Sequence, residues 1–248
     1  MRKIFRYECR RLLLNKFFAG LVLVLLAYGA MVLESATILG VSHTAPFSPW
    51  SFGDYLSRML PLLWVGASFF LTFFTSGRAR RAMALTDAAP MDARRYAWAR
   101  CAAALAGTAL MALSCLLEAA VFYGRYFGWY GWGSLLLPAL ATLVPALVFA
   151  LGCGWLLARI RPWLLYPWML LPFAAAALPL PEALGLWNGS LFTALPLTLG
   201  TLDPAFTLPA AAVIAQLVLL ACGTIALFIR PKRPGIRAAA AKGRSIHG

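Results

Sequence analysis

Side chains that could carry out catalysis are sparse in this sequence. Glu118 is the one carboxylate well inside a long apolar segment, and both histidines, His43 and His247, lie outside such segments. A serine–histidine or zinc mechanism needs a histidine at the depth of its other groups. The sequence has no GxSxG, HExxH or GxxxxGK[ST] motif and no CxxC pair. We therefore expect no catalytic residue, no metal site, no bound cofactor and no enzymatic activity in this chain.

Glu118 is the strongest candidate for a functional group inside an apolar segment. It precedes Tyr123 by five residues, which places it about 7–8 Å from the outer end of a helix that rises about 1.5 Å per residue. Carboxylates in membrane helices usually face the bundle interior or a water-filled path. Two interpretations stay open: a group on the translocation path, or a structural carboxylate that reaches the interface or pairs with Arg125.

Composition indicates what kind of element holds these residues. Of 248 residues, 62% are hydrophobic and 12% are charged, and the mean hydropathy is +0.79. An average soluble domain is about 45–50% apolar and about 25% charged. These values exclude a disordered chain, a coiled coil and an ordinary cytosolic enzyme. They predict an all-α polytopic membrane protein.

Six apolar segments are long enough to cross the hydrocarbon, which takes about 20 helical residues. We expect a single transmembrane domain over residues 1–248 with spans at about 17–39, 59–75, 101–123, 133–157, 163–180 and 206–229. Apolar and basic residues of 2–15 fall on different helical faces, which predicts an N-terminal interfacial helix. Between spans five and six, residues 181–204 are apolar but broken by Gly, Pro and Asn. We expect short outside or re-entrant helices there.

Basic residues are divided unequally between the two sides that six spans define. The net charge is +14. Twenty basic residues fall in the N-terminal segment, the loop at 76–100, the turn near Arg159 and the basic tail at 230–248, and only Arg58 and Arg125 fall on the other side. Because basic loops stay in the cytoplasm, we expect both termini there. The charge then attracts lipid headgroups, and we expect no nucleic-acid partner.

Two of the expected loops have a distinctive composition. The outside loop at 40–58 contains Trp50, Phe52 and Tyr55, which suit a membrane interface. The cytoplasmic loop SGRARRAMALTDAAPMDARRYAWAR carries two arginine clusters and predicts a short helix at 79–85, a break, and a second helix that leads into span three. Its guanidinium groups suit an acidic protein partner or phosphate headgroups. Topology determination alone is the other interpretation, and the two are compatible.

These features resemble the permease subunits of ABC-2 type (type V exporter-like) ABC transporters. The start MRKIFRYECRRLLLNKFF is similar to the connecting helix of that family. The segment RARRAMALTDAAPMDARRYAWAR, with its order of threonine, proline and basic residues, is similar to the family's coupling-helix segment. The broken region between spans five and six resembles the family's extracellular or re-entrant helices. The resemblance covers essentially the whole chain.

The resemblance implies a transport subunit that pairs with a second permease, identical or paralogous, and with two copies of a separate ATPase that binds ATP and Mg. It implies export of a peptide, drug or lipid-like substrate across a cell membrane, which we expect to be a bacterial plasma membrane. An integral membrane enzyme or an accessory protein without an ATPase is the alternative. The implied ATPase contact comprises Arg78, Arg80, Arg81, Thr86, Asp87, Pro90, Arg94 and Arg95, with Arg6, Glu8, Arg10 and Arg11 of the interfacial helix.

Overall fold

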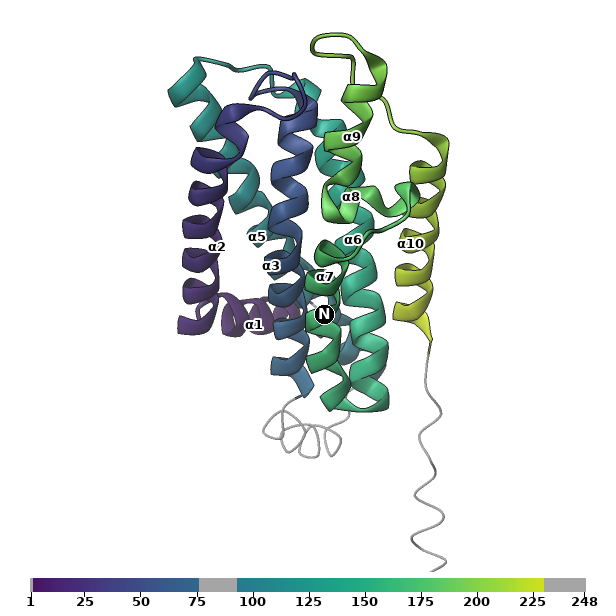
Figure 1. Ribbon diagram of the computed structural model, residues 1–248. Coiled ribbons are helices and arrows are strands. Elements are labelled where there is room, and N and C mark those ends of the chain that lie inside the picture. The colour runs from purple at the N-terminus through teal and green to yellow at the C-terminus, as the bar shows by residue number, and fades with distance from the viewer. Residues whose placement is uncertain (1, 76–92, 230–248) are drawn as a thin grey trace, which may run out of the picture.

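A computed structural model describes residues 2–75 and 93–229 of the protein (Figure 1). Within these ranges the chain is helical and has no strand. Five helices are long and apolar enough to cross a membrane. They are α2 (Lys16–Ser35), α3 (Pro49–Thr75), α5 (Ala93–Phe127), α6 (Gly133–Ile160) and α10 (Ala210–Phe228). The all-α prediction is therefore confirmed, together with the apolar character of these segments.

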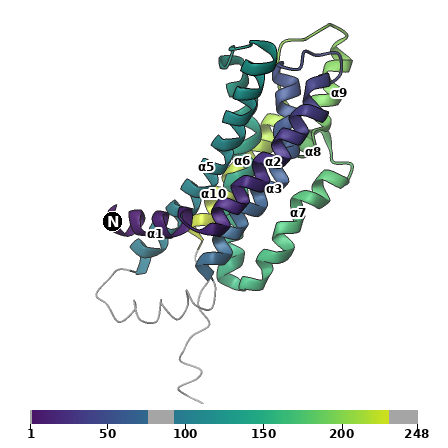
Figure 2. The same cartoon turned by 90° about the vertical axis from the view of Figure 1, so that its left-hand side faces the viewer.

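Shorter helices complete the described part of the chain. They are α1 (Arg2–Leu13), η1 (Thr37–Leu39), η2 (Pro162–Leu164), α7 (Leu165–Ala177), η3 (Glu182–Leu184), α8 (Gly185–Asn188) and α9 (Ser190–Leu199). Helix α1 lies crosswise to α2 at one end of the bundle (Figure 2). Asn15 separates the two helices, because its side chain accepts a hydrogen bond from the N–H of Phe17 and caps α2.

The fifth predicted span, 163–180, is not one long helix. Helix α7 has 13 residues and ends at Ala177, and the chain is irregular from 178 to 181. Pro179 and Pro181 lie in this stretch, and proline has no N–H with which to continue a helix. Helix α7 occupies one half of the bundle's height, and α8 and α9 lie in the other half (Figure 1). Six full spans are thus not observed in the described part of the chain. Short helices do form within 181–204, and their outside or re-entrant position stays a prediction.

Helix α3 begins at Pro49, well before the predicted start at 59. Ser48 Oγ accepts a hydrogen bond from the N–H of Ser51 at 3.2 Å, and proline suits the first position of a helix. The prediction that residues 40–58 form a loop is therefore wrong for the part after Ser48. Trp50, Phe52 and Tyr55, expected at an interface, are buried instead. Arg58, expected in the outer loop, lies inside the helix.

The core forms around α3, and α2 and α10 lie at the edges of the bundle (Figure 1). Trp64 and Phe70 of α3 are among the largest fully buried side chains.

Helices α6 and α10 cross with little space between their backbones. A Cβ on Gly152 would collide with the carbonyl oxygen of Gly223, and a Cβ on Gly223 would lie 2.6 Å from the Phe149 Cα.

Candidate functional site

Six of the eight predicted ATPase-contact residues of the cytoplasmic loop lie outside the described part of the chain. These are Arg78, Arg80, Arg81, Thr86, Asp87 and Pro90. Arg94 and Arg95 belong to the first turn of α5. The end of α3 and the start of α5, which flank this segment, lie at the same end of the bundle as α1 (Figure 1).

A buried ion pair fastens α1 to the start of α5. Glu8 is 0% exposed and Arg100 is 4% exposed, and Arg100 Nε lies 3.6 Å from Glu8 Oε1. The Tyr96 hydroxyl donates to Glu8 Oε1 at 2.8 Å and accepts from an Arg100 Nη at 2.8 Å. Buried charges are tolerated when they are paired and hydrogen-bonded. The arrangement therefore fixes where α1 sits on α5.

Aromatic rings and a second arginine surround this pair. The Arg100 guanidinium lies 4.3 Å from the Tyr96 ring centroid and 5.7 Å from that of Phe74. Arg11 lies 3.9 Å from Glu8 Oε2, with its guanidinium 4.9 Å from the centroid of a phenylalanine ring on α3. Cations over aromatic faces are attracted by the ring quadrupole. Helices α1, α3 and α5 thus meet at one place, which we call the Glu8 cluster (Glu8, Arg11, Tyr96 and Arg100).

The Glu8 cluster contains two of the four residues predicted on the interfacial helix. Glu8 and Arg11 belong to it, whereas Arg6 and Arg10 are exposed on α1. Sequence reasoning missed Tyr96 and Arg100 as its other members. Their spacing of four residues puts both on one helical face, and Glu8 is the one acid of a basic segment. Those two features are the signal that could have pointed to a pair.

Cys9 adjoins this cluster but is no candidate nucleophile. Burial, and then the negative charge of Glu8, raises the pKa of the Cys9 thiol above its ordinary value. The thiolate is the reactive form of cysteine, so the thiol stays protonated and inert at neutral pH. Among the described residues no group of three or more His, Cys, Asp and Glu side chains could hold a metal ion.

Glu118 lies at a junction of three helices. The Tyr55 hydroxyl of α3 donates to Glu118 Oε2 at 3.3 Å, and a Cβ on Gly29 of α2 would collide with that same oxygen. Glycine therefore provides the space that the carboxylate occupies. No ion pair joins Glu118 to Arg125 within the described residues. The side chain faces the neighbouring helices, and its role on a translocation path stays a prediction.

We expect Gly29→Leu to destabilise the protein by about 1–3 kcal/mol, because the added side chain overlaps the Glu118 carboxylate. Glu118→Gln should change the stability by less than about 1 kcal/mol, since the amide oxygen still accepts from Tyr55. Thermal unfolding in detergent compares the two variants. If Glu118→Gln lost as much stability as Gly29→Leu, the negative charge of Glu118 would itself stabilise the junction. In a transport assay, unaltered transport by Glu118→Gln would leave this residue a structural role alone.

A second ion pair lies inside α3 and was not anticipated. Arg58 Nε donates to Asp54 Oδ2 at 2.8 Å, with the Asp54 side chain 4% exposed and that of Arg58 47% exposed. Gly189, between α8 and α9, has a φ of +78°, and a Cβ there would lie 2.8 Å from Asp54 Oδ1 and 2.7 Å from Ser57 Oγ. Only glycine adopts this conformation readily. The turn therefore approaches the carboxylate closely.

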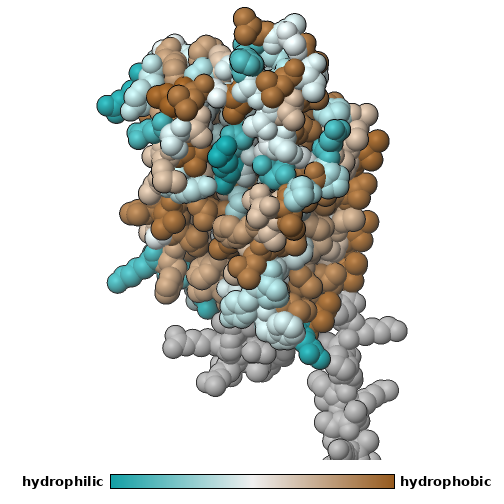
Figure 3. Space-filling model, in the orientation of Figure 1, coloured by the Kyte–Doolittle hydropathy of each residue, from teal (hydrophilic) through white to brown (hydrophobic). Residues whose placement is uncertain are grey.

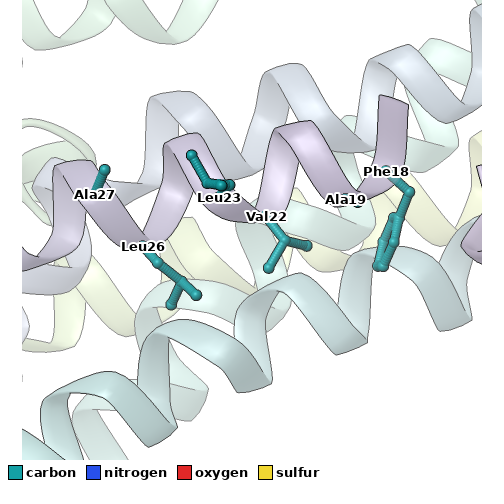
Figure 4. Close-up of a pocket in the computed structure, with 6 residues that line it drawn as sticks. All are labelled: Phe18, Ala19, Val22, Leu23, Leu26 and Ala27. Atoms are coloured by element: carbon teal, nitrogen blue, oxygen red, sulfur yellow. The ribbon is translucent and has the colours of Figure 1, made fainter. Parts of the chain in front are cut away.

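A shallow hollow along α2 has an almost wholly apolar lining (Figure 4). Its walls are Phe18, Ala19, Val22, Leu23, Leu26 and Ala27. Phe18, Val22 and Leu26 point toward the neighbouring helix (Figure 4). A surface of this kind suits hydrocarbon and offers no group for catalysis.

Comparisons with protein-family models, with curated proteins and with solved structures gave no match.

Proposed function

We propose that the chain is the membrane-spanning permease subunit of an ATP-driven ABC-2 type exporter, energised by a separate ATPase subunit. One observation carries the proposal. An amphipathic helix, α1, is held crosswise by a buried ion pair at the end of the bundle where the arginine-rich segment 76–92 joins α3 to α5. Five long apolar helices support a multi-pass membrane protein. The sequence has no P-loop of its own, so ATP and Mg would bind the partner.

The proposed coupling follows from the connections at this end. Helix α5 starts at Ala93, directly after the arginine-rich segment, and the Glu8 cluster ties that start to α1. An ATPase that displaces the segment would therefore move the start of α5 and α1 together. Two ATPase copies would act on a pair of permeases, identical or paralogous, with all termini in the cytoplasm. The exported molecule would be a peptide, a drug or a lipid-like compound.

Gentle detergent extraction from native membranes, followed by identification of co-purifying proteins, tests the assignment. We expect a soluble subunit with a P-loop in near-equal amount. A chain that purifies alone at every detergent strength would overturn the proposal. It would favour an integral membrane enzyme or an accessory protein.

Replacing four arginines of the cytoplasmic loop and of the first turn of α5 should uncouple the transporter. We combine four substitutions: Arg80→Ala, Arg81→Ala, Arg94→Ala and Arg95→Ala. We expect this variant to insert normally into the membrane but to lose transport-stimulated ATPase activity, because acidic residues of the ATPase would lose the guanidinium groups that donate to them. The matched control removes four basic residues of the tail: Arg230, Lys232, Arg233 and Arg237. Equal activity of the two variants would contradict a specific role for the loop.

A further inference from the structure

Gln216 is a polar residue that faces the bundle interior from the apolar helix α10. It is the one glutamine of the sequence and is 5% exposed. Nearby, Ile214 and Leu217 are 62% and 59% exposed, and Figure 3 shows the edge formed by α10 as hydrophobic. Both polar atoms of the Gln216 side chain are buried without a hydrogen bond among the described residues. Buried polar groups are normally satisfied, so this amide needs a partner other than a protein group.

Helix α6 lies beside α10 and runs in the same direction. At their C-terminal ends, Nη1 of Arg159 donates to the Ile229 carbonyl at 3.4 Å. About two turns earlier, a Cβ on Gly152 would collide with the carbonyl oxygen of Gly223. The paired residues are 70 positions apart in the first case and 71 in the second. The offset between facing residues of the two helices is therefore constant.

The same offset sets Gln216 opposite a turn of α6 that a proline interrupts. Its Cα is level with Pro145, and a long helical side chain leans back over the turn that precedes it. The amide is therefore level with Ala141 and Thr142 of α6. Ala141 packs against the hydrophobic cluster that contains Ala212, the residue one turn before Gln216, and this contact agrees with the offset.

This turn of α6 supplies two further polar groups that need partners. Pro145 has no N–H, so the carbonyl of Ala141 lacks the donor that a regular helix would give it. Thr142 is 0% exposed, and its Oγ1 is buried without a hydrogen bond among the described residues. Thr108, a buried threonine of α5, instead donates to the Ala104 carbonyl of its own helix. An amide, a hydroxyl and a carbonyl thus lie at one level between α6 and α10.

Water satisfies these groups better than a cation does. The Gln216 amide offers donors and an acceptor, the Thr142 hydroxyl offers one of each, and the Ala141 carbonyl is an acceptor. A water molecule donates as well as accepts, and a buried one takes about 2–4 polar partners. A sodium ion would leave the amide N–H groups without an acceptor. Helices α6 and α10 also contain no carboxylate to balance its charge.

We propose that the Gln216 amide, the Thr142 hydroxyl and the Ala141 carbonyl form a binding site for water between α6 and α10. The site lies about 9 Å from the start of α10, since Gln216 follows Ala210 by six residues that rise about 1.5 Å each. The two helices are then joined in two ways, through backbone contact at the glycine pair and through a water bridge one heptad earlier. This inference goes beyond the proposed function and does not depend on an ATPase partner.

Solid-state NMR of the unaltered protein in lipid bilayers tests the site. Because the chain has a single glutamine, isotopic labelling of the glutamine side-chain nitrogen gives one amide signal, that of Gln216. Magnetisation is transferred to this signal from water protons in one experiment and from lipid acyl-chain protons in another. We expect a signal from water and none from lipid. A signal from lipid alone, or from neither source, would overturn the site, and so would a chemical shift that changes when sodium replaces potassium.

Thr142→Val removes one of the groups that hold the water. We expect the water-transferred signal of Gln216 to be lost or greatly weakened in this variant. Thr224→Val is the matched control, because Thr224 is exposed on α10 and its Oγ1 donates to the Leu220 carbonyl of its own helix. The control should keep the full signal. Equal signals in the two variants would contradict the role of the Thr142 hydroxyl.

Pro145→Ala tests the carbonyl in the same way, because alanine returns an N–H to Ala141 as a helical donor. Its matched control is Pro138→Ala, which removes the other proline inside α6. We expect the first variant to weaken water transfer to Gln216 and the second to leave it unchanged. Unchanged transfer in both would exclude the Ala141 carbonyl from the site. The measurement on the unaltered protein gives an answer even if a variant fails to fold.

Discussion

Gly152→Ala is expected to destabilise the protein by about 2–3 kcal/mol, the range of an overpacked core. The helices α6 and α10 touch through their backbones at this point. A Cβ on Gly152 would collide with the Gly223 carbonyl oxygen, and neither helix can yield by rotating one side chain. The two helices must therefore separate, and their dispersion contacts weaken. Small residues that allow close approach are the usual means of packing helices in a membrane.

Gly20→Ala is the matched control for this experiment. Gly20 also lies inside a long helix, α2, and a Cβ there meets nothing within 4 Å. Alanine has a helix propensity about 1 kcal/mol better than glycine, so this variant should be as stable as the parent or more so. Thermal unfolding in detergent, followed by loss of the monodisperse peak in size-exclusion chromatography, compares the two. Equal midpoints would refute the close crossing of α6 and α10.

Arg100→Ala is expected to release α1 from the bundle. Removing one partner of a buried ion pair costs about 3–5 kcal/mol, because the other charge is left without compensation. Here the remaining charge is Glu8, which is 0% exposed, with the Tyr96 hydroxyl and the more distant Arg11 still beside it. The carboxylate then gains by moving into water, and α1 moves with it. Limited proteolysis of the N-terminal segment measures this release directly.

Two comparisons separate the ion pair from a general loss of charge. Arg10→Ala removes an exposed arginine of α1 and should leave the proteolysis rate unchanged. In a double-mutant cycle, Glu8→Ala with Arg100→Ala should lose less stability than the sum of the single variants. Additive losses would mean that the two side chains do not interact. If α1 also couples to an ATPase, Arg100→Ala should reduce stimulated ATPase activity. The activity of Arg10→Ala then shows whether the exposed face of α1 contributes to that coupling.

Helices α2, α6 and α10 were predictable because length and hydropathy alone define them. The predicted ranges 17–39, 133–157 and 206–229 each contain or overlap one observed helix. Helix α3 was predicted too short because Asp54 and Arg58 read as loop residues, whereas they neutralise each other inside the helix. The break after α7 depends on two prolines whose effect a hydropathy count does not include. In the first case, the pairing of Asp54 with Arg58 makes two charged residues compatible with the helix. In the second, the prolines end the helix because they lack a backbone N–H.

In the candidate sites, the sequence likewise identifies some residues but not their partners on other helices. Glu118 was predictable as an acid in an apolar segment, but its neighbours Gly29 and Tyr55 come from other helices and carry no local signal. The Glu8 cluster joins residues that are 88 positions apart in the case of Tyr96. The four-residue spacing marks Tyr96 and Arg100 as one helical face, but it does not identify the helix that supplies their acidic partner. The arginine-rich segment was predicted from its charge pattern, and its residues 76–92 lie outside the described part of the chain.

The Glu8 cluster also sets an order of assembly. Helix α1 is synthesised before α5, and its partner Tyr96 follows Glu8 by 88 residues. At about 5–20 residues per second, the ribosome takes roughly 5–20 s to make that stretch. During this interval Glu8 has neither Tyr96 nor Arg100, so it stays in contact with water and α1 cannot take its final place. This end of the protein is therefore completed only after the start of α5 has left the ribosome.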